Sequence, residues 1–464
     1  MLVRLAVSAV AVLALLPTAQ ANDLMQIYEQ ARTADQTLAA ARHARDAAVE
    51  ARPQALAGIL PQLSASGGLT RQKTDYLGTT SSFLQAGTSA YATNKSWSVV
   101  LDDTLFSIAA FRKLGQADVS VAAAQNTFQN AQQSLILRVA QAYFDVLSAR
   151  DTLRADEAAR DAFRAERDEA RAQFQVGLTT ITAVQQAQAS LDSSQATLIG
   201  DRRALENARQ GLAVIVGHAV APLQPLLPNI PLTPPTPDTA AAWVQTAQDD
   251  NLDLRGALLQ WQIAQREVGI QRAQRYPTLN LQGSVGRSDT GGQSGIDQRQ
   301  YAIGLVLQLP IFEGGLIRSQ IRQAAATASQ NQSQYQLTQR DTIQQVRDAY
   351  LGVTSGIAAV RSFKQAVISN RTALKSTQMG LQVGTQTETD VLTAVQNLYS
   401  SLKNYYQARY QYLDAVLTLE QLAGHLTVAD LERIDALLDT NPAAEPPLFP
   451  PAPLRPDDTT QAAG

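Results

Sequence analysis

Four short segments of the chain alternate apolar and polar residues, which is the pattern of a β-strand with one apolar face. The first two segments are residues 63–76 and 97–106. The other two begin at Leu279 and Tyr301 and are separated by a loop over 288–298. From Tyr301 onward, every second residue of the last segment is apolar. We therefore predict four strands per chain.

Two much longer stretches lack the residues that end helices. Residues 111–174 contain no proline and a single glycine, and residues 316–381 contain no proline. Each is predicted to be one helix, about 95–100 Å long at a rise of about 1.5 Å per residue. They are rich in Ala and Gln, and small side chains let helix backbones approach closely, as in long coiled coils. A shorter helix is predicted over residues 22–52, closed by Pro53 and Pro61.

A short stretch of the chain occurs twice. Residues 174–188 read FQVGLTTITAVQQAQ and residues 381–395 read LQVGTQTETDVLTAV, with seven identities at one constant offset. Matches at the same or similar offsets extend in both directions, so two halves of the chain are related. The predicted organisation is a signal peptide over 1–21, a first repeat over 22–221, a Pro-rich linker over 222–237, a second repeat over 238–425, a further segment over 426–440, and a disordered tail over 441–464.

Each copy of the short stretch predicts a helical hairpin tip. A long helix reaches Gly177 or Gly384, and Gly is the residue that most readily takes the left-handed conformation just past a helix end. Threonines that can cap a second helix follow. Thr182 with Gln185 has the spacing of a capping box, and Thr387 with Asp390 has a looser version of it. Turn geometry alone explains the Gly and Thr residues.

The apolar residues Val176 and Val383 have no such explanation, since both fall at an exposed tip. They favour a role of the tips in docking a partner.

Composition and charge exclude several classes of function. The formal net charge of −3 offers no basic surface for nucleic acid, and the absence of Cys excludes disulfides and thiol catalysis. His43, His218 and His425 lack the spacing of metal ligands. No catalytic constellation is present, so we expect neither enzymatic activity nor a cofactor or metal. No segment after residue 21 has the run of about 20 apolar residues that a membrane-spanning helix requires.

Taken together, the motifs resemble those of the TolC family of outer-membrane ducts for efflux and type I secretion. The resemblance covers residues 22–424 and rests on the order and spacing of several short motifs. They are the two Gln-Val-Gly tips, the strand entries Leu-Pro-Gln-Leu at 60–63 and Tyr-Pro-Thr-Leu at 276–279, and Arg-Val-Ala-Gln-Ala-Tyr-Phe-Asp-Val-Leu at 138–147.

The resemblance implies a mainly α-helical homotrimer with a shared twelve-stranded transmembrane β-barrel. That barrel would lie in the outer-membrane lipid of a Gram-negative bacterium, continued by a coiled-coil helical tunnel in the periplasm. Residues 426–440 would form a periplasmic equatorial segment of that tunnel. Its expected partners are a periplasmic adaptor (membrane fusion) protein and an inner-membrane pump of the RND, ABC or MFS type. Independently, four strands cannot close a bacterial barrel, for which even counts start at about eight. Two or three copies would satisfy that condition, so the trimer is implied by the resemblance alone.

The resemblance also implies two sets of site residues at the tips. The adaptor-binding set is Val176, Gly177, Leu178, Val383, Gly384 and Thr385. The periplasmic gate set is Asp390, Thr393, Glu388, Gln386 and Thr182.

The gate motif matches the family only in part. Asp390 falls on the first acidic position of the family gate, but Thr393 replaces the second acid and Gln386 replaces the Arg of an ionic latch. The position of the acidic residue that pairs with that Arg in the family is occupied by Ala183. The position of a Tyr that is usual in the family is occupied by Leu381. Hydrogen bonds from Gln386, Thr182 and Thr389 would replace the latch, or the closed state would be leakier.

Two further points stay open at the level of sequence. Acidic residues in the first turn of a helix interact favourably with the helix dipole. We favour this structural role for Glu388. For Asp390 it is an alternative to a role in lining the pore. A periplasmic adaptor and a structural coiled-coil protein are alternative functions, because both contain long helices. Neither class carries barrel strands.

Overall fold

The computed structural model describes residues 22–75, 77, 89–291, 295–439 and 448–449. The predicted signal peptide and all but two residues of the predicted tail lie outside these residues. The described chain divides into two compact units. One comprises residues 22–39, 131–251 and 342 onward, and the other comprises residues 40–130 and 252–341.

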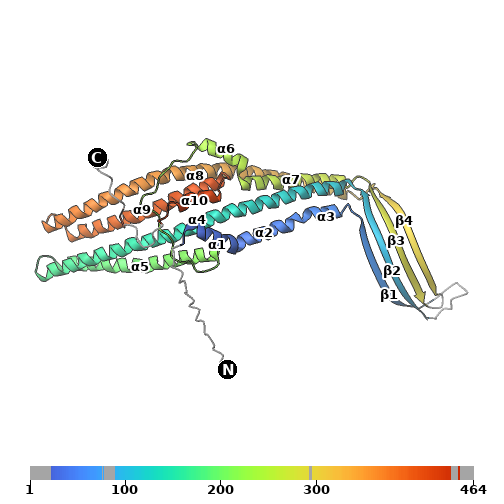
Figure 1. Ribbon diagram of the computed structural model, residues 1–464, viewed down its shortest axis with the longest axis horizontal. Helices are drawn as coiled ribbons and strands as arrows, with labels where there is room; N and C mark the ends of the chain where they lie inside the picture. The colour runs from blue at the N-terminus through green and yellow to red at the C-terminus, as the bar shows by residue number, and fades with distance from the viewer. Residues whose placement is uncertain (1–21, 76, 78–88, 292–294, 440–447, 450–464) are drawn as a thin grey trace, which may run out of the picture. The chain divides into compact units, whose positions relative to one another are not determined.

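Helices make up most of the described chain (Figure 1). They are α1 (Leu24–Ala34), α2 (Gln36–Val49), α3 (Ala51–Ala57), α4 (Ile108–Gln175), α5 (Ile181–Val216), α6 (Ala240–Asp250), α7 (Leu252–Ala273), α8 (Leu316–Gln382), α9 (Glu388–Leu422) and α10 (Val428–Asp435). The two predicted long helices are confirmed as α4, with 68 residues, and α8, with 67. None of the described helices has a stretch apolar and long enough to cross a membrane.

The helix predicted over residues 22–52 is divided into α1, α2 and α3. Asp35 takes an extended conformation between α1 and α2, where its carboxylate accepts a hydrogen bond from the Leu38 N–H at 2.7 Å and forms an ion pair with Arg138 at 3.0 Å. Pro53 does not end a helix, because it lies in the first turn of α3. A proline there removes only an N–H group that has no acceptor within the helix.

Four antiparallel strands form one sheet in the order β1-β2-β3-β4 (Figure 1). They are β1 (Gln62–Asp75), β2 (Ser89–Phe106), β3 (Thr278–Gly291) and β4 (Ile296–Gln308). The predicted strand count is confirmed, but β2 begins eight residues before its predicted start and β3 and β4 extend into the predicted loop. The added segments lack apolar alternation. Their backbones nevertheless form hydrogen-bonded pairs with the neighbouring strands. The prediction missed them because it used the side-chain pattern, which does not show where backbones pair.

The register gives the sheet one apolar face and one polar face, because side chains alternate along each strand and odd-numbered residues pair with odd-numbered ones. The apolar face carries Leu63, Leu69, Trp97, Val99, Leu101, Leu279, Leu281, Val285, Tyr301, Ile303, Leu305 and Leu307. The polar face carries Ser64, Ser66, Thr70, Ser96, Ser98, Asn280, Gln282, Ser284, Ser288, Gln298 and Gln300. The hydroxyls of Ser66 and Ser98 lie 2.9 Å apart across the polar face.

Candidate functional site

The first hairpin tip joins α4 to α5. Gly177 takes the left-handed conformation with φ of +78°, and the N–H of Leu178 donates to the carbonyl of Gln173 at 2.8 Å. This closes the end of α4 with a six-residue hydrogen-bonded turn. Thr180 then caps α5, its hydroxyl accepting from the N–H of Ala183 at 3.3 Å. The prediction that Thr182 and Gln185 form a capping box is wrong, since α5 begins at Ile181 and Thr182 already lies inside it.

The second tip joins α8 to α9 with the same geometry. Gly384 also has φ of +78°, and the N–H of Thr385 donates to the carbonyl of Gly380 at 2.9 Å. Here the predicted capping box is confirmed. The N–H of Thr387 donates to the Asp390 carboxylate at 2.8 Å, while the Thr387 hydroxyl accepts from the Asp390 N–H at 3.3 Å.

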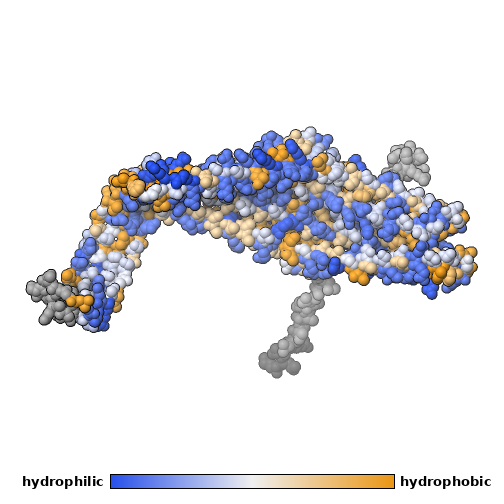
Figure 2. Space-filling view, turned by 180° about the vertical axis from the view of Figure 1, so that it is seen from behind, coloured by the Kyte–Doolittle hydropathy of each residue, from blue (hydrophilic) through white to orange (hydrophobic). Residues whose placement is uncertain are grey.

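The side chains around the two glycines are exposed and apolar. Val176, Leu178 and Val383 are 70%, 78% and 74% exposed. Figure 2 shows apolar surface at the end of the molecule where α4 turns into α5 and α8 turns into α9. The tips also touch each other, because the Thr389 hydroxyl donates to the side-chain oxygen of Gln186 at 2.8 Å. Exposed apolar residues at such a turn are suited to contact another protein.

Asp390 remains charged and exposed at the start of α9. Hydrogen bonds from the backbone and hydroxyl of Thr387, the latter at 2.7 Å, hold the pKa of its carboxyl below the usual value. The capping role weighed for Asp390 is therefore present. Gln386 and Thr393 belong to the same tip as Asp390, whereas Thr182 lies in the first turn of α5 at the other tip. The Thr393 hydroxyl donates to the Thr389 carbonyl of its own helix at 2.8 Å, and Gln386 packs over Gly380.

Glu388 lies in the same turn as Asp390 but faces inward. It is only 8% exposed, and its Oε1 has no hydrogen-bond partner. Burial, together with the carboxylates of Glu166 and Glu169, raises the pKa of Glu388 to about 7. We expected the helix dipole to favour the charged form of Glu388. Burial and the neighbouring carboxylates disfavour that form and determine the direction of the pKa shift. Glu166 is itself 7% exposed and accepts a hydrogen bond from the Gln378 amide at 2.8 Å.

The matching family is that of outer membrane efflux proteins, whose model covers residues 27–218 and 243–425. The chain belongs to this family.

Among the similar proteins is the outer membrane protein TolC of Vibrio cholerae, 30% identical over 90% of this chain and 94% of TolC. Another is the alkaline protease secretion protein AprF of Pseudomonas aeruginosa, 30% identical over 89% of this chain and 86% of AprF. The crystal structure of VceC, also from Vibrio cholerae, has the same fold. It matches with a TM-score of 0.72 at 22% identity, over 86% of this chain and 96% of VceC.

The resemblance to TolC is thus confirmed, and this member of the efflux family is an outer-membrane duct for efflux or secretion in a Gram-negative bacterium. Its family is one of channels rather than of enzymes. Within the described residues no group of three or more His, Cys, Asp or Glu side chains is arranged to hold a metal ion.

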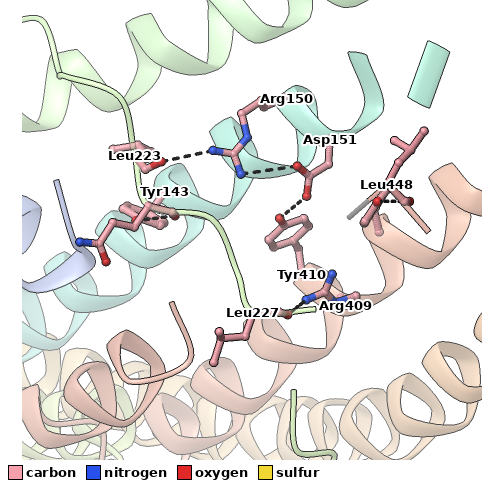
Figure 3. Close-up of polar contacts among 10 residues, drawn as sticks. Tyr143, Arg150, Asp151, Leu223, Leu227, Arg409, Tyr410 and Leu448 are labelled. Carbon is pink, nitrogen blue, oxygen red and sulfur yellow. Dashed lines mark hydrogen bonds and ion pairs between the residues drawn. The ribbon is translucent and has the colours of Figure 1, made fainter. Parts of the chain in front are cut away.

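A second polar cluster, which the sequence analysis did not find, holds the linker of this efflux protein (Figure 3). Asp151 on α4 is 5% exposed and accepts from the Tyr410 hydroxyl at 2.6 Å. Arg150 donates to the carbonyl of Leu223 at 3.2 Å, and Arg409 donates to the carbonyl of Leu227. These contacts fix a segment whose prolines prevent it from pairing regularly. The only signal in the sequence was the high density of Tyr residues in α9, which contains five.

Two residues of the predicted tail, Leu448 and Phe449, are described. The Tyr406 hydroxyl on α9 donates to the Leu448 carbonyl at 2.5 Å. The guanidinium of Arg371 on α8 lies 4.7 Å from the centre of the Phe449 ring. At these two residues the tail contacts both helices of the second hairpin.

Proposed function

We propose that three copies of this chain close a twelve-stranded barrel in the outer membrane and continue it as a helical tunnel. The trimer would be the exit duct of a tripartite efflux pump or of a type I secretion system, passing small molecules or proteins to the outside. The observation that carries this proposal is the sheet, which has one apolar face, one polar face and two unpaired edges, β1 and β4.

The edges of the sheet support closure by other copies. The β1 and β4 strands run in opposite directions, so β4 of one copy can pair antiparallel with β1 of the next. Each backbone group left unpaired in lipid costs several kcal/mol, so a lone sheet would not insert stably. An eight-stranded barrel has an interior about wide enough for its own side chains. Three copies rather than two are therefore needed for a duct.

The two faces of the sheet provide a test of this arrangement. Ile303 is 81% exposed on the apolar face, and its neighbour Ala302 lies on the polar face. A cationic side chain facing lipid near the bilayer midplane costs about 2–4 kcal/mol, whereas one facing a water-filled lumen does not. We expect Ile303→Arg to abolish heat-sensitive oligomers in outer-membrane fractions and Ala302→Arg to keep them. Equal tolerance of both variants would contradict a lipid-facing apolar surface.

The tips support a further part of the proposal, the docking of a periplasmic adaptor linked to an inner-membrane pump of the RND, ABC or MFS type. The docking residues would be Val176, Gly177, Leu178, Val383, Gly384 and Thr385. Because the chain contains no Cys, a single Cys can be placed at Leu178 with no background reaction. We expect crosslinks to an adaptor from Leu178→Cys but not from Val214→Cys, which replaces a residue 81% exposed at the other end of α5. Equal capture from both positions would count against the tips.

We also propose that the tips narrow the periplasmic end of the duct. Asp390 would line the opening together with Thr393, Gln386 and Thr182. Glu388, which is 8% exposed, would lie behind these residues rather than in the opening. Ala183 and Gln386 cannot form the ionic latch expected from the resemblance, and the hydrogen bond from Thr389 to Gln186 supports a neutral substitute. The alternatives of an adaptor and of a structural coiled coil leave the two-faced sheet without a role.

A further inference from the structure

Charged side chains are distributed unequally over the two faces of the sheet. Nine of the ten charged residues in the four strands have odd numbers and so share the apolar face. They are Arg71, Lys73, Asp75, Lys95, Asp103, Arg287, Asp289, Asp297 and Arg299. All but Asp103 lie toward the ends of the strands remote from the helices, where two ion pairs, Arg287 with Asp297 and Lys73 with Asp75, connect some of them. The one charged residue on the polar face is Asp102.

The surroundings of Asp102 are neutral and open. Its partners across the sheet are Gln62 on β1 and Gln282 on β3, and Gln282 is opposite Gly304 on β4. These four residues form one row across the polar face of the sheet. A Cβ atom added to Gly304 would meet nothing within 4 Å, so no side chain occupies the space above the row at Gly304. Asp102 itself is exposed. No Lys or Arg of the described strands shares its face, and its charge is therefore not balanced within the sheet.

We infer that Asp102 is a selectivity-determining residue of the barrel, which favours cationic over anionic solutes. The inference rests on the proposed function, in which the polar face lines the lumen and three chains close the barrel. Three Asp102 carboxylates then form one ring, since symmetry places them at the same height. Gln62, the first residue of β1, lies in the same row, so the ring is at the end of the barrel nearest the helices. A ring of one sign in a confined pore concentrates counter-ions.

Asp103 supplies a matched control because it is the adjacent residue, carries the same charge and lies on the opposite face. In planar bilayers under a gradient of dilute salt, we expect Asp102→Asn to lower the cation-to-anion permeability ratio roughly two-fold and Asp103→Asn to leave it unchanged. The effect should fade at high salt, because the Debye length falls from about 30 Å at 0.01 M to about 3 Å at 1 M. Both variants should be compared in the Asp390→Asn background, which removes the other proposed ring.

A second measurement does not depend on whether the tips are closed. Single Cys variants at Asp102 and Asp103 are treated, in intact cells, with a charged thiol reagent that does not cross membranes. We expect the Cys at 102 to react and the Cys at 103 to be protected by lipid. Reaction at 103 alone, or a selectivity change in Asp103→Asn alone, would overturn the assignment of the polar face to the lumen.

Two other results would also be decisive. Selectivity that is the same in Asp102→Asn and wild type in dilute salt would overturn the ring while leaving the duct intact. Wild-type protein that forms no channels would overturn the proposed function itself, and this inference with it.

Discussion

Replacing Glu388 by Gln should strengthen the second tip at neutral pH and leave it unchanged in acid. Gln keeps the size of the side chain but removes the charge that burial and the neighbouring carboxylates of Glu166 and Glu169 disfavour. The pKa of Glu388 is raised from 4.5 to about 7. Each pKa unit corresponds to about 1.4 kcal/mol, so the ionised group costs the folded tip on the order of 3 kcal/mol.

The pH range of this effect follows from the direction of the shift. The folded state binds the proton more tightly than the unfolded state, so stability falls as pH rises between the two pKa values. The cost is absent below pH 4.5, grows up to pH 7 and is complete above it. Glu388→Gln should therefore match wild type near pH 4 and exceed it most at pH 8.

Hydrogen exchange of the amides around residues 381–395 measures the opening of this tip in the intact protein. Wild type and variant are compared at the same pH, which cancels the intrinsic pH dependence of exchange. A difference of 3 kcal/mol corresponds to roughly 100-fold slower exchange at pH 8 if the tip opens locally.

Asp390 provides the contrast, because hydrogen bonds from Thr387 lower the pKa of its carboxyl. Its ionised form therefore stabilises the tip above its ordinary pKa, and that contribution is lost as pH falls through the lowered pKa. Asp390→Asn should speed exchange at pH 8. If the amides exchange equally slowly in Glu388→Gln and in wild type at pH 8, the ionised Glu388 carboxylate does not destabilise the tip and the reasoning is refuted. If the variant exchanges more slowly by the same factor at every pH, the gain comes from packing rather than from loss of the charge.

Three further predictions concern the tips and the linker. Gly177→Val and Gly384→Val should each impair export while oligomers persist, because φ of +78° costs a β-branched residue at least about 1–2 kcal/mol even though the added Cβ meets no atom; normal drug susceptibility in cells carrying either variant would exclude a docking role. Asp390→Asn should reduce the cation preference of the closed duct, with Glu388→Gln as the control, and an unchanged reversal potential would leave Asp390 as a helix cap only. Tyr410→Phe should lower the free energy of unfolding by about 1–3 kcal/mol, because it removes a hydrogen bond to the buried Asp151 carboxylate; a thermal unfolding curve identical to wild type would show that the bond contributes nothing.

The parts of the fold that could be predicted are those that depend on residues close together in the sequence. The long helices followed from the absence of proline, and the strands from alternation in segments such as the one beginning at Tyr301. The tip of α8 and α9 followed from Gly384 and the pair Thr387 and Asp390. At the other tip the same local rule chose Thr182, although the repeat aligns Thr180 with Thr387. Comparison of the two copies would have found the cap.

Apart from the cap of α5, the polar contacts that the sequence analysis missed at the tips and the linker join residues remote in the chain. Glu166, Gln378 and Glu388 come from α4, α8 and α9, and 212 residues separate the first two. Their burial depends on how these helices pack, which no local pattern reports. The same holds for Asp151 and Tyr410, which are 259 residues apart. Asp102 differs, because its face could have been assigned once the strand register was known.

The central claim is that three copies of this chain form one duct. The most direct test is the mass of the detergent-purified particle, measured by native mass spectrometry without heating. The account predicts a particle of three chains, since three sheets of four strands close a barrel wide enough to conduct. A particle of one chain or of two would contradict it, because one sheet cannot close and two would close only a barrel filled by its own side chains.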